Sequence, residues 1–296
     1  MGTPAQASTK TLSPRTVSRL LGLLDDSSLM PRLPAETIAD MSYLDFALYV
    51  GDAIVAPGGW PSMVALSRAA QVGSGDAILD VGSHSGHSSF VLSQCTGCRS
   101  VGIDLVPKYV ELARHLAAKL RVSSRITFGV ADARWLPFSD NSFNAVISTG
   151  TLPFIEDRRD LALEEARRVV VPGGRVIEVT YFYKQPPEAG VLEAVSDLMG
   201  IDVPPWGVQD YVSCFERAGL RLERCVDLAL PQRSMEDAHG FGTLAVEQVL
   251  EREARLRECE PPSDVRAVLS RRLLAAIETF QANNQRLGAA ILLFRK

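Results

Sequence analysis

Three carboxylates, Asp80, Asp104 and Asp132, each stand at or just beyond the end of a short apolar segment. Short apolar segments bounded by turn residues are typical of buried β-strands, and the carboxyl ends of parallel strands meet at one edge of a sheet. We therefore expect the three acids in one crevice. There Asp80 suits an ammonium group, Asp104 suits ribose hydroxyls, and Asp132 suits an adenine amino group.

A turn with two glycines follows the first of these acids. In Asp80-x-Gly82-x-x-x-Gly86 the glycines let the chain reverse tightly and let a ligand approach the main chain. A helix that begins at Ser85 or His87 presents free N–H groups there, which suit a carboxylate or a phosphate. A dinucleotide site instead carries G-x-G-x-x-G. The carboxylate of Asp80 would also repel a pyrophosphate, so a nicotinamide oxidoreductase is disfavoured.

These segments belong to an ordered set of motifs that resembles the class I S-adenosylmethionine-dependent methyltransferases, and specifically the group that acts on small molecules. The resemblance covers residues 49–230 and a final strand. It rests on Asp80-Val81-Gly82, Gly102-Ile103-Asp104, Ala131-Asp132-Ala133, Leu136-Pro137-Phe138, Phe143-Asn144-Ala145-Val146-Ile147 and Pro172-Gly173-Gly174. His84 departs from the pattern because it replaces the usual middle glycine, and Asn144 replaces a common aspartate. The methionine pocket therefore has to accommodate a side chain, although histidine tolerates left-handed backbone better than most residues.

The resemblance implies that S-adenosyl-L-methionine is the cofactor and that no metal is needed. It also implies that the cofactor lies on the glycine turn and the strand tips. The residues expected to bind it are Asp80, Gly82, Ser83, His84, Gly86, Asp104, Leu105, Ala131, Asp132, Ala133 and Thr149.

Catalytic candidates come from three places in the chain. Thr151 follows the fourth expected strand and faces the reactive methyl, or caps a turn. Tyr181 lies near the end of the fifth strand. His239 is our first choice for a general base if one is used, because the ordinary pKa of histidine lies near neutrality; the alternative is a surface or capping histidine beside a glycine. The aromatic candidates for substrate contact, each of which could instead be core, are Tyr49, Trp60, Phe154, Tyr183 and Trp206.

The order of strands and helices predicts an α/β fold, because strands that alternate with helical segments form a parallel sheet covered on both faces. We expect strands at 77–81, 100–105, 126–130, 145–148, 175–182, 222–230 and 287–294. The helices expected from apolar periodicity are 35–50, 63–70, 88–93, 107–120, 157–170, 188–199, 209–218, 244–256 and 264–282. With the resemblance, this is a Rossmann-like, seven-stranded, mostly parallel sheet whose last strand is antiparallel.

The chain divides into four predicted parts. Residues 1–60 form an N-terminal helical extension and a segment that covers the cofactor, and residues 61–230 form the cofactor-binding core. Residues 231–284 form a helical cap insertion, and residues 285–296 supply the final core strand. The N-terminal or cap helices are also the surfaces that we expect a homo-oligomer to use.

Composition narrows the class of protein. A 296-residue chain with 46% hydrophobic residues can bury a large core. The net charge of −4 and the lack of a long basic run disfavour a nucleic-acid partner. Five cysteines favour a reducing compartment, and the Cys95-x-x-Cys98 pair is either an ordinary loop or a redox or metal motif. We expect no membrane span or secretion signal, and so a cytoplasmic protein.

The sequence thus predicts a methyltransferase that acts on a small, fairly apolar metabolite, with natural-product biosynthesis as its setting. Two alternatives remain open. The same fold could bind the cofactor only as a placed charge and catalyse a cyclisation or isomerisation, or it could methylate protein or RNA through an open basic surface. The acceptor molecule and the acceptor atom are not specified by the sequence.

Overall fold

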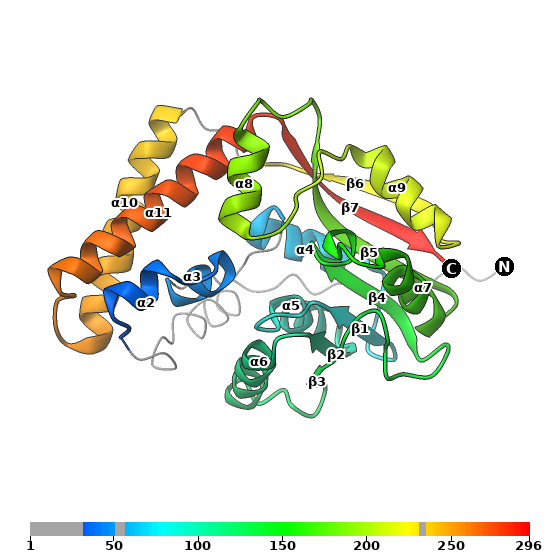
Figure 1. Cartoon of the computed structure of the whole chain (residues 1–296). Coiled ribbons are helices and arrows are strands. Elements are labelled where there is room, and N and C mark those ends of the chain that lie inside the picture. Colours follow the sequence, from blue (N-terminus) through cyan, green and yellow to red (C-terminus); the bar gives the residue numbers. More distant parts are fainter. Residues whose placement is uncertain (1–31, 51–56, 231–234) are drawn as a thin grey trace.

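A seven-stranded sheet organises the molecule (Figure 1). The structure is a computed structural model that describes residues 32–50, 57–230 and 235–296. The strands are β1 (Ala77–Val81), β2 (Arg99–Asp104), β3 (Ile126–Val130), β4 (Phe143–Thr149), β5 (Val170–Tyr183), β6 (Arg221–Leu228) and β7 (Leu287–Arg295). Their order is β3-β2-β1-β4-β5-β7-β6, and β7 is antiparallel to both of its neighbours. The predicted Rossmann-like sheet is confirmed.

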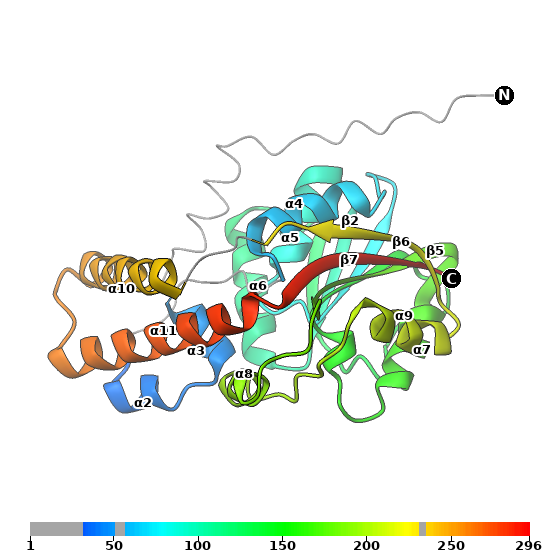
Figure 2. The ribbon, with the colours of Figure 1, turned by 90° about the horizontal axis from the view of Figure 1, so that it is seen from above.

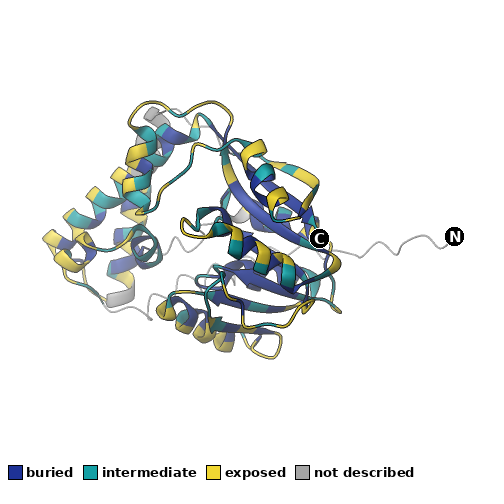
Figure 3. Cartoon of the chain, turned by 45° about the vertical axis from the view of Figure 1, so that its right-hand side comes forward, coloured by how far each residue is buried: buried dark blue, intermediate teal, exposed yellow. Residues whose placement is uncertain are grey.

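Helices cover both faces of this sheet. Helices α4 (Gly59–Ala69) and α5 (His87–Thr96) pack on one face, and α7 (Arg159–Val169) and α9 (Val208–Arg217) pack on the other. Helix α6 (Pro107–Lys119) packs on β3 beside α5. The central strands are therefore buried on both sides (Figure 3), which explains why they are continuous apolar runs instead of alternating ones.

The last strand packs closely against its neighbour β5 within the sheet. Every residue of β7 from Leu287 to Phe294 is buried. Its second residue, Gly288, lies so close to Phe182 of β5 that a Cβ atom there would meet the ring at 2.4 Å. The small residues at the start of β7 therefore leave room for aromatic side chains on β5.

A second group of helices lies beside the sheet. It contains α2 (Ala35–Ala39), α3 (Tyr43–Tyr49), α8 (Val191–Met199), α10 (Met235–Arg257) and α11 (Ser263–Asn284). In both views of the ribbon, α10 and α11 lie side by side and extend away from the sheet (Figures 1 and 2). Apolar side chains of α2, α3, α10 and α11 share one core, which is separate from the cores on the two faces of the sheet.

The predicted helix at 35–50 is two helices instead of one. Helix α2 ends at Ala39, and α3 starts after Ser42, whose hydroxyl accepts the N–H of Asp45 at 3.2 Å. A serine in this place is a strong helix start signal, so the sequence contained the break. Residues 1–31 of the predicted N-terminal helical extension lie outside the described residues. The predicted four-part division stays a prediction, although the helices at 35–49 pack on those at 235–284.

The strands point toward this second group of helices. β7 starts where α11 ends and runs away from the helices to the C-terminus (Figure 1). The other strands run in the opposite direction to β7, so their carboxyl ends lie on the side of the helices. Ligands of such sheets bind at this edge. Among the residues that the structure describes, no helix is long and apolar enough to cross a bilayer.

One arginine joins two segments of the helical group that are far apart in the sequence. The guanidinium of Arg272 on α11 donates to the main-chain oxygens of Ile38, Ala39 and Met41 at the end of α2. It also lies over the ring of Phe46, at 4.4 Å from the ring centroid. The last carbonyls of a helix have no partner within the helix, so Arg272 supplies donors to main-chain oxygens that α2 itself leaves unpaired.

We expect Arg272→Ala to lower the free energy of unfolding by about 1–3 kcal/mol, because several charge-assisted hydrogen bonds to carbonyls are lost together. The adjacent Arg271 is exposed on the same helix, so Arg271→Ala is a matched control that should change the free energy little. Urea denaturation of both variants measures the difference. Equal midpoints would show that Arg272 does not hold α2 in place.

Candidate functional site

The structure brings the three predicted carboxylates to neighbouring strand tips. Asp80 on β1 pairs with Gly102 of β2, and Asp104 at the end of β2 pairs with Val130 of β3. The N–H of Ala131, next to Asp132, donates to the main-chain oxygen of Asp104 at 3.1 Å. One edge of the sheet therefore carries all three acids, as the sequence predicted, but each of them is used differently.

Asp80 is fully buried and holds the start of α5. Its Oδ2 accepts the hydroxyl of Ser89 at 2.7 Å and the N–H of Ser89 at 3.1 Å. Burial raises the pKa of Asp80 to about 6, while the hydrogen bonds from Ser89 oppose the shift. From its buried position, Asp80 therefore fixes the first turn of α5, which follows the glycine turn.

Asp104 joins the glycine turn to the next helix. Its Oδ2 accepts the N–H of His84 at 2.9 Å, and its Oδ1 accepts the N–H of Val106 at 2.9 Å. Each oxygen keeps acceptor capacity for a ligand hydroxyl, because a carboxylate oxygen has two lone pairs. The side chain is only partly buried, so Asp104 is the acid best placed to face a ribose.

The carboxylate of Asp132 forms an ion pair with Arg134. Arg134 donates from Nε and Nη2 to its carboxylate at 2.8–3.2 Å, and the Arg134 N–H donates to Oδ1. Hydrogen bonds from Arg134 lower the pKa of Asp132. The predicted contact between Asp132 and an adenine amino group would compete with this ion pair, which the sequence Asp132-x-Arg134 could have indicated.

The glycine turn touches the loop after β4. Gly82 has φ +70°, and a Cβ atom there would meet the Thr151 Oγ1 at 2.1 Å. Gly86 has φ +89°, and a Cβ there would meet the ring of Phe128 at 2.5 Å. His84 adopts φ +47°, so the residue that replaces the family's middle glycine takes a left-handed backbone, as histidine tolerates.

Buried polar atoms without hydrogen-bond partners gather at this turn. At the turn and the end of β1 they include the Oδ1 of Asp80, the Oγ of Ser83, and the Nε2 atoms of His84 and His87, and others lie elsewhere in the described part of the chain. An unpaired buried polar group costs about 1–3 kcal/mol, and native proteins have few of them. A concentration in one turn indicates that a polar ligand contacts it.

Exposed apolar side chains stand next to the same turn. Leu105, which follows Asp104, is 63% exposed, and Val130 at the tip of β3 is 51% exposed. Leu105 follows Asp104 in the chain and Val130 pairs with Asp104 across the sheet, so both apolar residues neighbour the acid best placed to face a ribose. The unpaired atoms, the glycine cradle and this apolar surface together fit a nucleoside with a charged tail.

The tip of β4 is held by a pair that the sequence analysis missed. Glu178 on β5 is fully buried, and its Oε1 accepts the N–H of Gly150 at 3.0 Å. Ser148 accepts the N–H groups of Thr151 and Leu152 at 3.3 and 3.0 Å. Burial raises the pKa of Glu178 well above its ordinary value, against hydrogen bonds from Ser148 and Gly150. A glutamate inside the apolar run at 176–179 was the available signal.

The threonines at this tip have separate environments. Thr149 Oγ1 lies 3.4 Å from the hydroxyl of Ser88 at the start of α5. Thr151 packs on Gly82, as described above, and precedes the short 3-10 helix η2 (Leu152–Phe154). Both threonines therefore lie where the turn after β1 and the loop after β4 meet, and their predicted roles stay predictions.

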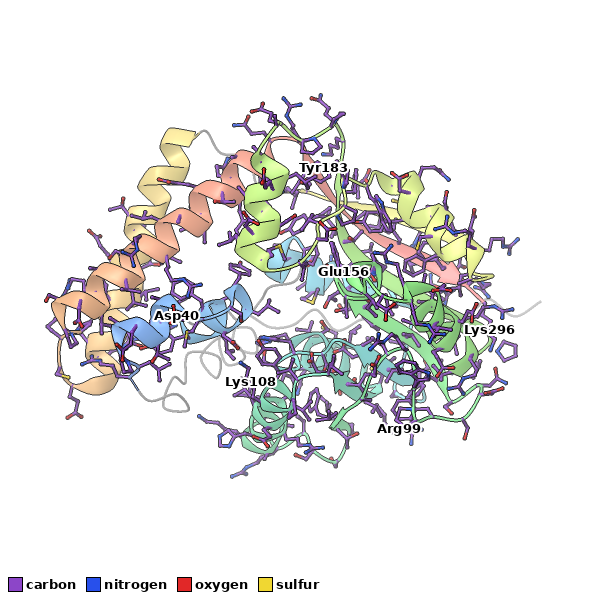
Figure 4. The ribbon with its side chains drawn as sticks, viewed as in Figure 1. Asp40, Arg99, Lys108, Glu156, Tyr183 and Lys296 are labelled. Atoms are coloured by element: carbon purple, nitrogen blue, oxygen red, sulfur yellow. The ribbon has the colours of Figure 1, made fainter. Side chains whose placement is uncertain are left out.

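The two candidate tyrosines of β5 have different environments, and only one of them is exposed. Tyr181 is 36% exposed, and its hydroxyl accepts the N–H of Gly58 at 3.2 Å. Tyr183 is buried, and its hydroxyl donates to Asn283 of α11 at 2.8 Å (Figure 4). Tyr183 thus fastens α11 to the sheet, and Tyr181 is the better candidate for ligand contact.

The other predicted aromatic contacts are mostly core. Tyr49 is buried in the core shared by α2, α3, α10 and α11. Trp206 packs edge-on against Tyr211 and under Arg159, and Phe154 is partly buried in η2. The side chains of Trp60 and His239 lie outside what the structure describes, although His239 belongs to α10. Whether Tyr49, Phe154 and Trp206 are buried depends on tertiary packing, which local periodicity does not specify.

The Cys95-x-x-Cys98 pair is consistent with an ordinary helix end. Both cysteines are free and buried, and burial raises the pKa of the Cys98 thiol, against a hydrogen bond from Thr96. A raised thiol pKa disfavours the reactive thiolate.

Comparisons with known proteins agree with this geometry. Residues 78–174, from β1 to β5, match the family model of a methyltransferase domain. Tocopherol O-methyltransferase of Arabidopsis thaliana is 31% identical over 160 residues, which are 51% of this chain and 45% of that protein. The 27-O-demethylrifamycin SV methyltransferase of Amycolatopsis mediterranei is 31% identical over 53% of this chain and 58% of that protein. The chain spans about half the length of the curated relatives it matches.

Solved structures share the fold. The MccD protein superposes with a TM-score of 0.69 at 20% identity, over 81% of this chain and 99% of that chain. The [4+2]-cyclase SpnF gives a TM-score of 0.59 at 20% identity, over 79% of both chains. Geranyl diphosphate methyltransferase in complex with SAM gives 0.55 at 17% identity, over 79% and 84%.

The buried Glu178 gives a pH-dependent stability that can be measured. Its folded pKa is raised, so its contribution to stability is full below pH 4.5 and is lost as the pH rises toward the folded pKa. Glu178→Gln mimics the protonated acid. We expect equal free energies of unfolding near pH 4 and a variant that becomes increasingly more stable than the wild type from pH 5 to 8.

Urea denaturation across this pH range measures the gap. Glu193 is exposed on α8, so Glu193→Gln should show no pH-dependent gap. A constant difference between Glu178→Gln and the wild type would mean that Glu178 is ionised in the folded protein.

Proposed function

We infer that this chain is a class I S-adenosylmethionine-dependent methyltransferase and that it transfers a methyl group from that cofactor to a small, fairly apolar metabolite. The match to the family model at 78–174 includes the glycine turn and the carboxyl ends of β1 and β2, where Asp80 and Asp104 lie. The wider chain superposes on geranyl diphosphate methyltransferase with a TM-score of 0.55 over 79% of its length, so the two share a fold. Transfer to a small metabolite is the proposal.

One observation carries this proposal. Asp104 binds the glycine turn through His84 and lies next to the exposed Leu105, while the turn holds several unpaired buried polar atoms. An acid for hydroxyls, an apolar surface for a base, and a polar cradle for an amino-acid tail fit the three parts of S-adenosylmethionine. Ser83, His84 and Gly86 would hold the tail, and Leu105 and Val130 would contact the adenine.

The residues of the chain have a limited task in the reaction. The cofactor of this family supplies a methyl group that its sulfonium has already made electrophilic. The protein has to hold the acceptor in line and exclude water. The tip of β4, with Thr149 and Thr151, and the exposed Tyr181 are the groups on the side of the helices that would face the acceptor.

The class of acceptor follows from the surroundings of this tip. Helices α3, α8 and α11 lie on the side toward which the strands point (Figure 1), so these helices are the elements that would cover a bound acceptor. Two relatives are named as methyltransferases of tocopherol and of 27-O-demethylrifamycin SV. We place the reaction in natural-product biosynthesis on this basis.

Methyl-labelled cofactor tests the proposal. The chain is incubated with it and with panels of phenols, hydroquinones, amines and polyketide-type alcohols, and the products are separated by mass. We expect one labelled small molecule and an equal amount of S-adenosylhomocysteine. Labelled protein or RNA instead of a small molecule would support the macromolecular alternative, which the net charge of −4 disfavours.

A second function has one observation in its favour. The [4+2]-cyclase SpnF shares this fold, so a chain of this fold can be described as a cyclase. If the present chain worked in that way, substrate would be consumed with no S-adenosylhomocysteine formed. Mass analysis of the same incubations distinguishes the two reactions.

Replacement of Asp104 tests the cofactor site directly. Asp104→Ala removes the acceptor for ligand hydroxyls and for the N–H of His84, so we expect S-adenosylmethionine to bind about 1–3 kcal/mol more weakly. Isothermal titration calorimetry measures this. Glu111 is exposed on α6, and Glu111→Ala should bind the cofactor like the wild type. Unchanged affinity in Asp104→Ala would remove this residue from the site.

A further inference from the structure

The segment after β3 stays at the ligand-binding edge of the sheet. The N–H of Ala131 donates to the main-chain oxygen of Asp104 at 3.1 Å, and Ala131 and Ala133 pack on the core that contains the ends of β1 and β2. The next residue is Arg134, whose Nη1 donates at 3.2 Å to Asp157, in the segment between β4 and α7. Because β2 and β1 lie between β3 and β4 in the sheet, this contact passes beside the tips of β2 and β1.

Exposed apolar side chains flank Arg134. Leu105 and Val130, which neighbour Asp104, are 63% and 51% exposed, and Trp135 is 57% exposed. The guanidinium of Arg134 lies over the ring of Trp135, at 4.9 Å from the ring centroid. In the proposed function Leu105 and Val130 contact the adenine of the cofactor, so the polar side chains that directly follow Val130 can reach the edge of the base.

Both carboxylate oxygens of Asp132 are already occupied. Oδ1 accepts the main-chain N–H and the Nε–H of Arg134 at 2.9 and 3.1 Å, and Oδ2 accepts Nε–H and Nη2–H at 3.2 and 2.8 Å. A carboxylate oxygen has two lone pairs, so one residue fills both oxygens. To accept the amino group of adenine, Asp132 would have to exchange a bidentate, charge-assisted pair for a single hydrogen bond.

Arg134 has hydrogen-bond donors that Asp132 and Asp157 do not use. A guanidinium carries five N–H groups and no acceptor. Nε–H and one hydrogen of Nη2 bind Asp132, and one hydrogen of Nη1 binds Asp157, so each Nη keeps one hydrogen without a partner among the described residues. The side chain of Arg134 is 25% exposed, which leaves these N–H groups accessible to a ligand.

We propose that Arg134 reads the base of the cofactor by donating to an acceptor atom on the edge of the base, and that Asp132 holds Arg134 in place. The inference rests on the proposed function and names a specificity-determining residue of the same site. Adenine offers ring nitrogens as acceptors, but its amino group is a donor, and a guanidinium cannot accept from it. The site therefore does not require the amino group.

A base with a keto oxygen in place of the amino group suits this arrangement. Arginine donates to a keto oxygen and the adjacent ring nitrogen when it reads guanine in DNA, and inosine presents the same pair of acceptors. A carboxylate that is not paired with arginine has the opposite preference, because it accepts from an amino group and repels a keto oxygen. Arg134 and Asp132 thus predict different affinities for an inosine derivative.

Calorimetric titration with two ligands tests this assignment. S-adenosylhomocysteine and S-inosylhomocysteine differ only in the base, and neither needs a methyl acceptor to bind. We expect the two Kd values of the wild type to agree within about threefold, because a site that makes no hydrogen bond to the amino group does not discriminate strongly for it.

Arg134→Ala should create a preference for adenine. In this variant Asp132 is free to accept the amino group, and a keto oxygen would face its carboxylate. We expect S-inosylhomocysteine to bind on the order of tenfold more weakly than S-adenosylhomocysteine, the cost of one badly paired polar group. The ratio of the two Kd values is the readout, because a general loss of affinity affects both ligands alike.

Two further variants complete the experiment. Arg134→Met removes the guanidinium but keeps an apolar stem beside Trp135, and it is used if Arg134→Ala fails to fold. Arg99 is exposed and begins β2, at the end of the strand away from Asp104 (Figure 4). Arg99→Ala is therefore the matched control, and both of its Kd values should equal those of the wild type.

The outcomes separate the role of Arg134 from the proposed function. A wild type that prefers S-adenosylhomocysteine, or an unchanged ratio in the Arg134 variants, would overturn this role while leaving methyl transfer intact. If neither ligand binds, both proposals fail. If both ligands bind but no acceptor is methylated, the proposed function fails, and the ratio of the Kd values still decides the role of Arg134.

Discussion

The close approach of two loops at the carboxyl ends of β1 and β4 is the constraint on which the site depends. Thr151 fills the space that a side chain at Gly82 would need, so the glycine turn and the β4 loop position each other. Asp104 fixes the same turn from β2, and Glu178 fixes the β4 loop from β5. Residues of four neighbouring strands or of the loops that follow them therefore fix the main chain of the site.

This rigidity is achieved with acids that the fold keeps out of water. Asp80 and Glu178 are fully buried, and burial raises the pKa of each. Buried carboxyls reduce stability at neutral pH, but each accepts N–H groups at the first residues of a loop or helix. The site thus exchanges some stability for loops whose main chain is fixed before a ligand arrives.

The helices beside the sheet depend on contacts between remote parts of the chain. Arg272 binds the end of α2, and Tyr183 binds Asn283 at the end of α11. Lys108 and Tyr109 at the start of α6 bind Asp45 of α3. These polar contacts connect the helices to the glycine turn. A movement of α3 would displace Tyr109 and with it the ring of His84, which packs on Tyr109.

The sequence by itself determined the sheet, the glycine turn and the adjacency of Asp80, Asp104 and Asp132, because apolar runs and strand-end placement are local properties. Tertiary structure decided what those residues do. Partners that arrive from elsewhere, such as Gly150 for Glu178, are set by packing between segments that no local pattern relates. The contact of Arg134 with Asp157 is likewise set by packing, because it joins the segment after β3 to the segment before α7.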